Sequence, residues 1–207
     1  MVGSWGLRGR SAHAGQTYIG PLVISLSACV VRDWRLDDAR SLARHANDRR
    51  IWLNLRDRFP HPYTLSDAEE FLAAVANSTP RTFFAIALDD QAVGGIGYTL
   101  HDDVERASAE IGYWLGTAYW GRGIMTSALR AVTAYAFDRH DVLRRVYAVP
   151  FAWSAASIRV LAKVGYQLEG RMRESAIKNG AAVDQLLYSI LRNECLAPSR
   201  DAQRVTT

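Results

Sequence analysis

One stretch of the sequence, residues 109–137, constrains what this chain can fold into more than any other. Near its start, Ile111, Tyr113 and Leu115 occupy alternate positions, and this alternation predicts a half-buried strand. Beyond a glycine-rich turn, apolar residues recur at three- and four-residue spacing, which predicts a helix; they are Met125, Ala128, Leu129, Val132 and Ala136. The sequence therefore predicts a strand, a tight turn and a helix in direct succession.

The turn between this strand and this helix is Gly121-Arg122-Gly123. The first N–H groups of a helix lack intrahelical partners, and the helix dipole is positive at that end. Glycines let the backbone approach an anion without a Cβ in the way. The pattern predicts a cradle for a phosphate group. An ordinary strand–helix turn fits the same spacing, so the spacing by itself leaves both interpretations open.

The run AEIGYWLG…YWGRGIMT resembles the acetyl-CoA-binding segment of the GNAT N-acetyltransferases, and more narrowly that of the RimJ/RimL-type branch, which acetylates protein N-termini and small amines. Trp120 stands where the general pattern Q/R-x-x-G-x-G/A has Gln or Arg, and Met125 stands where it has Gly or Ala. Both departures leave the backbone donors in place. The resemblance implies acetyl-CoA as co-substrate, bound by Trp114, Leu115, Gly121, Arg122, Gly123, Ile124, Met125, Thr126, Ser154 and Ser157.

A second element, residues 153–170, resembles the family pattern N-x-x-S-x-x-V-L-x-K-x-G-F…E-G. Ser154 replaces the Asn of the pattern; it can still cap a helix, but its reach toward the pantetheine arm is shorter. Ser157 matches the Ser of the pattern, although an ordinary first-turn polar residue would look the same. Leu161 occupies the position where many members carry a Tyr that protonates the leaving thiolate. The resemblance therefore implies that Ser157 assists thiolate departure.

Glu110 stands at the start of the central strand, where some GNAT enzymes carry a carboxylate base. A half-buried carboxylate there is a candidate general base, and a strand-end Glu that pairs with an Arg is the structural alternative. The catalytic candidates are thus Ser157 and Glu110. No metal is expected, because the histidines are too scattered in the sequence to form a ligand set.

A proline-stiffened segment, residues 54–64, gathers aromatic, charged and amide side chains. Pro60 and Pro62 exclude a helix, and loops of this kind often carry binding residues. The segment also resembles one that borders the acceptor cleft in RimJ/RimL-like enzymes. The predicted acceptor-binding residues are Asn54, Arg56, Asp57, Phe59 and Tyr63. A rigid connector between two helices is the alternative.

The other predicted elements complete the order β-α-α-β-β-β-α-β-α-β-β, which is also the GNAT order. This order predicts an α/β fold with a mixed, mostly antiparallel central sheet flanked by helices. Glycines at positions 94, 95 and 97 predict a bulge or a close backbone approach. The remaining elements are a first strand over 22–33, a helix from about 37, a helix opened by a capping box at Ser66 and Glu69, a hairpin over 82–100, a strand over 145–149, a helix over 154–164, a loop or extended excursion over 171–180 and a last strand over 183–191.

The chain of 207 residues is predicted to form one domain over 21–195, with a flexible leader at 1–20 and a flexible tail at 196–207. A composition of 49% hydrophobic and 22% charged residues is that of a globular protein. The net charge of +4 comes from dispersed arginines, and no apolar run is long enough for a membrane span, so neither nucleic acid nor a membrane is an expected partner. Cys29 and Cys195 show no metal-like spacing, which favours a reducing cytoplasm.

These patterns together predict an acetyl-CoA-dependent N-acetyltransferase. In the predicted reaction, a neutral primary amine attacks directly within a ternary complex, and a strand N–H near Leu115 supports the carbonyl oxygen. The acceptor is a protein N-terminus or a small-molecule amine such as an aminoglycoside or polyamine. An acyl-CoA-binding sensor without transferase activity stays open, because Ser154 and the missing Tyr depart from the pattern. The assembly is left open, with a homodimer as one alternative.

Overall fold

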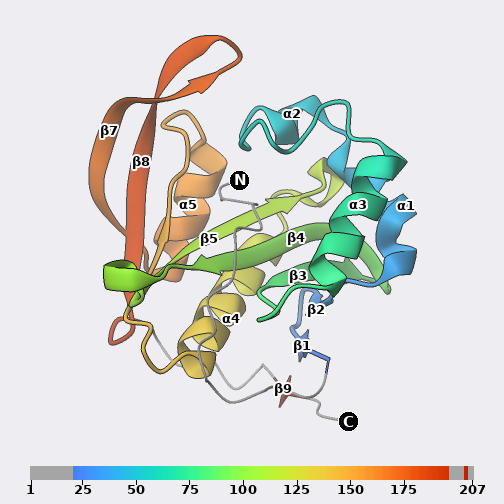
Figure 1. The fold of residues 1–207 in the computed structure, drawn as a ribbon, viewed down its shortest axis with the longest axis horizontal. Coiled ribbons are helices and arrows are strands. Elements are labelled where there is room, and N and C mark those ends of the chain that lie inside the picture. The colour runs from blue at the N-terminus through green and yellow to red at the C-terminus, as the bar shows by residue number, and fades with distance from the viewer. Residues whose placement is uncertain (1–20, 196–202, 205–207) are drawn as a thin grey trace.

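The computed structural model describes residues 21–195 and 203–204, and it shows one twisted mixed sheet with helices on both faces (Figure 1). Within those residues the sheet order is β7-β8-β6-β5-β4-β3-β2-β1-β9. Nearly all neighbouring strands are antiparallel; β5 and β6 are parallel. The predicted mixed, mostly antiparallel α/β sheet is therefore confirmed. The predicted leader, and the predicted tail apart from residues 203–204, lie outside the described residues.

The first half of the chain forms β1 (Val23–Ser25), β2 (Val30–Asp33), α1 (Ala39–Ala46), α2 (Arg49–Trp52), α3 (Leu65–Ala76), β3 (Phe83–Leu88) and β4 (Gln91–Leu100). The second half forms β5 (Ser108–Leu115), α4 (Ile124–Arg139), β6 (Arg145–Ala148), α5 (Ala155–Val164), β7 (Gln167–Lys178), β8 (Ala181–Leu191) and the short β9 (Gln203–Arg204). β9 lies within the predicted tail and pairs with β1.

Two hydrophobic clusters occupy the two faces of the sheet. The larger cluster joins α4 and α5 to the sheet and includes Ile111, Tyr113 and Leu115. The smaller cluster joins α1, α3 and the 54–64 segment to Trp114. β5 is consequently buried on both faces from Ala109 to Leu115, so the prediction of a half-buried strand was wrong. The second layer of helices is the reason, because it covers the face that alternation alone would leave to solvent.

Three predicted elements differ from the structure. The strand expected over 22–33 is a hairpin of β1 and β2, closed by a hydrogen bond from Leu26 N to Cys29 O of 2.9 Å. The excursion expected over 171–180 is largely the second half of β7, which pairs with β8 as far as Lys178. The capping box of α3 is formed by Thr64 and Asp67, two residues earlier than the predicted Ser66 and Glu69.

The glycines of β4 allow the sheet to close tightly. A Cβ on Gly94 would lie 2.6 Å from the Trp114 carbonyl oxygen, and a Cβ on Gly97 would lie 2.5 Å from Phe83 Cδ1. The β3–β4 register also shifts beside Ile86. The predicted bulge or close approach is therefore confirmed. No helix among the described residues is long and apolar enough to cross a membrane.

The cap of α3 gives a test of the local structure. Thr64 Oγ1 accepts a hydrogen bond from Asp67 N, and Asp67 accepts one from Thr64 N. We expect Thr64→Ala to lower the free energy of unfolding by about 1 kcal/mol, because one helix N–H loses its acceptor. Chemical denaturation measures this loss. Thr64→Ser keeps the hydroxyl and should stay close to wild type; equal losses in both variants would contradict the capping role.

Candidate active site

The two parallel strands of the sheet separate after three residue pairs. β5 and β6 pair at Ser108–Arg145, Ala109–Val146 and Glu110–Tyr147, and no later pair follows. β5 continues to Leu115 while it remains paired with β4 on its other edge. From Ile111 to Leu115, therefore, the edge of β5 that faces β6 has no strand partner among residues 21–195 and 203–204.

The direction of one backbone bond shows which groups lie on that open edge. Gly116 N donates to Val93 O of the neighbouring chain segment at 2.8 Å, so the Gly116 amide points toward the β4 side. Amide directions alternate along a strand. The N–H and C=O groups of Ile111, Tyr113 and Leu115 therefore point to the unpaired side. An extended ligand that lies in this opening can hydrogen-bond to these groups as an additional strand would, except to the Leu115 carbonyl oxygen, which accepts a hydrogen bond from Trp120 Nε1.

The glycine turn lies beyond the end of β5 and begins α4. Gly121 and Gly123 have φ values of +77° and +76°, in the left-handed region that favours glycine. A Cβ built on either residue would meet nothing within 4 Å, so the space around both is open. Gly123 is the N-cap of α4 and supplies no side chain, which leaves the first N–H groups of Ile124, Met125 and Thr126 available. The geometry fits the predicted pyrophosphate cradle.

Polar contacts fasten this turn to the rest of the domain. Trp120 Nε1 donates to Leu115 O at 2.7 Å, and Thr117 Oγ1 donates to Asp48 Oδ2 at 2.9 Å. Hydrogen bonds from Arg50 hold the pKa of Asp48 at about 2, so Asp48 is a carboxylate at neutral pH. The Arg122 guanidinium lies over the Tyr119 ring at 5.6 Å. The turn is thus fixed by side chains that leave its glycine backbone uncovered.

Ser157 lies in the first turn of α5 and is only 1% exposed. Its Oγ is buried and has no hydrogen-bond partner in the described part of the chain. An unpaired buried hydroxyl costs free energy, so this atom retains unused hydrogen-bonding capacity within the described residues. The hydroxyl of Tyr113 lies 3.5 Å from the Ser157 carbonyl oxygen, which places this turn of α5 next to β5. Ser154 occupies the N-cap position, but its side chain makes no capping hydrogen bond.

Glu110 is 7% exposed, and its Oε1 accepts a hydrogen bond from Arg56 Nη2 at 2.6 Å. The structural alternative for Glu110, an ion pair with an Arg, is therefore present. The role of Glu110 as a general base stays a prediction. Tyr147 of β6 lies opposite Glu110 in the parallel strand pair and was not among the predicted site residues. Burial, and then the negative charge of Glu110, raise the pKa of the Tyr147 phenol, whose oxygen lies 2.8 Å from His101 Nε2.

The 54–64 segment does not present all of its predicted residues to an acceptor. Asn54 donates to the Arg50 carbonyl oxygen at 2.9 Å, which is a local structural bond. Asp57 accepts a hydrogen bond from Lys178 Nζ at 2.6 Å, so its charge is already matched by a partner from β7. No sequence signal marked Lys178, because it lay in the predicted excursion.

The aromatic residues of this segment line a cavity of about 410 Å³ on the α1–α3 face of the sheet. Phe59 packs against Tyr63 at 4.7 Å and against Trp114 at 5.9 Å between ring centroids. Asp67 and Glu70 of α3 add carboxylates to the lining. The Trp114 side chain thus belongs to this face. The expectation that it binds the cofactor is corrected, because strand alternation directs it away from α4.

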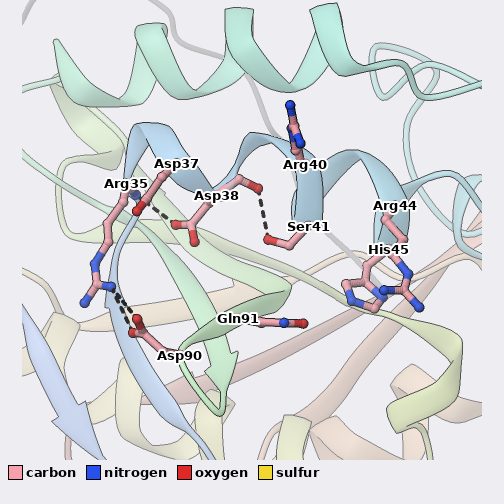
Figure 2. A pocket seen from close by; sticks show the side chains of 9 residues that line it. All are labelled: Arg35, Asp37, Asp38, Arg40, Ser41, Arg44, His45, Asp90 and Gln91. Atoms are coloured by element: carbon pink, nitrogen blue, oxygen red, sulfur yellow. Dashed lines mark hydrogen bonds and ion pairs between the residues drawn. The ribbon is translucent and has the colours of Figure 1, made fainter.

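A second hollow of about 330 Å³ lies along α1 and the β3–β4 turn, and Figure 2 shows its polar lining. Arg35 and Asp90 form an ion pair across it at 2.9 Å, while the side chains of Arg44 and His45 lie near Gln91 (Figure 2). None of the predicted site residues lines this hollow. Burial and the charge of Arg44 lower the pKa of His45. Within residues 21–195 and 203–204, no three His, Cys, Asp or Glu side chains are grouped to hold a metal ion.

Comparison with known proteins agrees with this geometry. The profile of the Acetyltransferase (GNAT) domain matches residues 29–167. The Uncharacterized N-acetyltransferase p20 of Bacillus licheniformis is 26% identical over 172 residues, which are 79% of this chain and 93% of that protein. The Ribosomal-protein-serine acetyltransferase of Escherichia coli K12 is 30% identical over 106 residues, 51% of this chain and 58% of that protein. The structure of Mycobacterium smegmatis RimJ in complex with CoA-disulfide superposes with a TM-score of 0.74 at 24% identity, over 84% of this chain and 88% of that one.

The fold, the glycine turn and the open edge of β5 define an acyl-CoA-dependent transferase. The chain belongs to the GNAT acetyltransferase family. It is an acetyl-CoA-dependent N-acetyltransferase, as the sequence predicted.

The glycine turn generates the first prediction about this site. Gly123→Val should abolish CoA binding, because it adds a branched side chain to the cradle and forces an L-residue into a left-handed conformation. Arg122→Ala should only weaken binding, since the backbone donors remain. Isothermal titration calorimetry with CoA measures both. Gly180→Val is the matched control, because Gly180 has a similar φ of +79° and similar open space at the β7–β8 tip; unchanged affinity in Gly123→Val would refute the cradle.

Proposed function

We propose that this enzyme acetylates the N-terminal amine of a protein in the cytoplasm by direct attack of the amine in a ternary complex. The acceptor class is supported by the name of the E. coli relative, a ribosomal-protein-serine acetyltransferase. The proposed site consists of two halves, one on each face of β5. Ser157 and Tyr113 belong to the α4–α5 face, whereas Glu110 and Arg56 belong to the face that carries the 54–64 segment.

This division suits a transfer reaction between two substrates that arrive from opposite sides. Acetyl-CoA, when bound, supplies the activated acetyl group. The N–H groups of Tyr113 and Leu115 lie on the open edge, where they would donate to the carbonyl oxygen as negative charge develops on it. The observation that carries the proposal is the buried Ser157 Oγ, which has no hydrogen-bond partner among residues 21–195 and 203–204 and whose helix turn lies next to β5.

Each proton and each bond in the proposed reaction has an assigned place. A bond forms between the amine nitrogen and the acetyl carbon as the carbon–sulfur bond breaks. Glu110, directly or through a water, takes the proton that the nitrogen loses; Arg56 holds one oxygen of this carboxylate, and Oε2 is the oxygen we assign to the proton. Ser157 Oγ donates a hydrogen bond to the departing sulfur. No covalent enzyme intermediate is needed.

Removal of the Ser157 hydroxyl tests the leaving-group half. Ser157→Ala should lower kcat by roughly 100-fold, at the lower end of the range for a positioned acid, with little change in acetyl-CoA affinity. That combination marks an interaction made only in the transition state. A thiol-release assay gives kcat, and calorimetry gives the affinity. A variant with full turnover would exclude Ser157 from the chemistry.

A panel of acceptors tests the substrate class. Peptides with a free N-terminus should give a higher kcat/KM than aminoglycosides or polyamines, and N-terminally blocked copies of the same peptides should give none. The measurement is thiol release from acetyl-CoA, with mass spectrometry to locate the acetyl group. Preferential acetylation of a small amine would contradict the proposed protein acceptor and indicate a small-molecule acceptor. The absence of turnover with every amine would favour a CoA-binding sensor.

A further inference from the structure

Lys178, the last residue of β7, is a buried charged side chain that the reaction does not use. It is 3% exposed. Its Nζ lies 2.6 Å from Asp57 Oδ1 and 3.8 Å from the centre of the Trp52 ring. Removing an ammonium from water costs free energy unless a counter-charge and good geometry repay it. A carboxylate and an aromatic face supply both here.

These contacts join two parts of the molecule that are far apart in sequence. Trp52 is the last residue of α2, and Asp57 lies in the segment that follows it. Figure 1 shows the tip of the β7–β8 hairpin reaching toward α2, beyond the part of β8 that pairs with β6. The hairpin tip is therefore attached to the segment that leads into the acceptor side of the proposed site.

Asp57 is adjacent in sequence to Arg56, and the two side chains bind different strands. Arg56 bonds to Glu110 of β5 at 2.6 Å, while Asp57 bonds to Lys178 of β7 at 2.6 Å. A loop held at two consecutive residues from two sides has little freedom to move at that point. Of these two side-chain bonds, loss of the one to Lys178 would leave the loop with only the bond of Arg56, whose side chain is 41% exposed, to Glu110.

We propose that Lys178 is a positioning residue: through Asp57 it fixes the 54–58 loop so that Arg56 remains bound to Glu110. The inference rests on the proposed function, because it assigns Glu110 to the acceptor half of the site. Glu110 faces Arg56 from the loop and Tyr147 from β6. The β7–β8 hairpin thereby contributes to acceptor handling without contact with the reacting atoms.

The test compares variants that break the hairpin–loop contact with one that breaks a different bond in the same hairpin. Lys178→Met keeps a long apolar side chain against Trp52 and removes the charge; Lys178→Arg keeps the charge. Asp57→Asn breaks the contact from the exposed side, which protects the experiment against a folding defect in the Lys178 variant. Arg171→Gln is the matched control, because it removes the ion pair with Asp184 within the hairpin and does not involve the loop.

The expected result is a fall in kcat/KM for the amine of roughly ten-fold in Lys178→Met, the size expected for one hydrogen bond to a charged group. Acetyl-CoA affinity should be unchanged, and the acid limb of the pH–rate profile should move toward that of Arg56→Gln. Lys178→Arg should recover most of the lost kcat/KM. The double variant Lys178→Met/Asp57→Asn should lose less than the sum of the two single losses, because both substitutions break the same contact. Arg171→Gln should match wild type.

Hydrogen–deuterium exchange over residues 54–59 separates this inference from the proposed function. Exchange there should rise in Lys178→Met even if the wild-type protein acetylates none of the amines offered, since the measurement needs no turnover. Unchanged exchange in Lys178→Met would overturn the positioning role. So would an acid limb of the Lys178→Met pH–rate profile that stays at the wild-type position while that of Arg56→Gln moves. An equal loss of kcat/KM in Arg171→Gln would overturn it as well.

Discussion

The end of pairing between β5 and β6 after Glu110 is the constraint on which the rest of the site depends. A sheet that stayed paired to Leu115 would use the N–H groups of Tyr113 and Leu115 for its own ladder. Because the strands separate, these groups are available to a ligand. Glu110 lies at the last β5–β6 pair, where the gap begins, and the glycine turn follows the end of β5.

The two faces of β5 differ in what they bury: one packs mainly apolar side chains, and the other also holds ion pairs. The α4–α5 face is mostly apolar; the buried Thr133 hydroxyl of α4 is bonded to Tyr166, whereas Ser157 Oγ has no partner among the described residues. The other face carries ion pairs, Arg56–Glu110 and Asp57–Lys178, that are already satisfied within the protein. The first face thus carries an unpaired hydroxyl, whereas the second carries the paired charges and the cavity of about 410 Å³.

Two errors made from sequence have different physical causes. β7 was expected to be partly a loop because most of its residues are charged or exposed on both faces, so it has no alternation to detect. Only its pairing with β8 makes it a strand. Trp114 was assigned to the cofactor because it lies within the family segment, yet alternation along the strand directs its ring to the α1–α3 face. The first error is thus resolved by the hairpin partner of β7, and the second by alternation within β5 itself.

The sequence by itself determined the strand–turn–helix unit, the two left-handed glycines that begin α4, and the positions of Ser157 and Glu110, because each depends on local periodicity or on backbone conformation. The tertiary structure alone decided that Glu110 binds Arg56, that Asp57 pairs with Lys178, and that Ser157 Oγ has no hydrogen-bond partner in the part of the chain that is described. Hydrogen bonds and desolvation are set by which surfaces meet in space. A sequence pattern does not contain these long-range contacts. For this reason the ion pairs of the acceptor side could be identified only in the folded molecule.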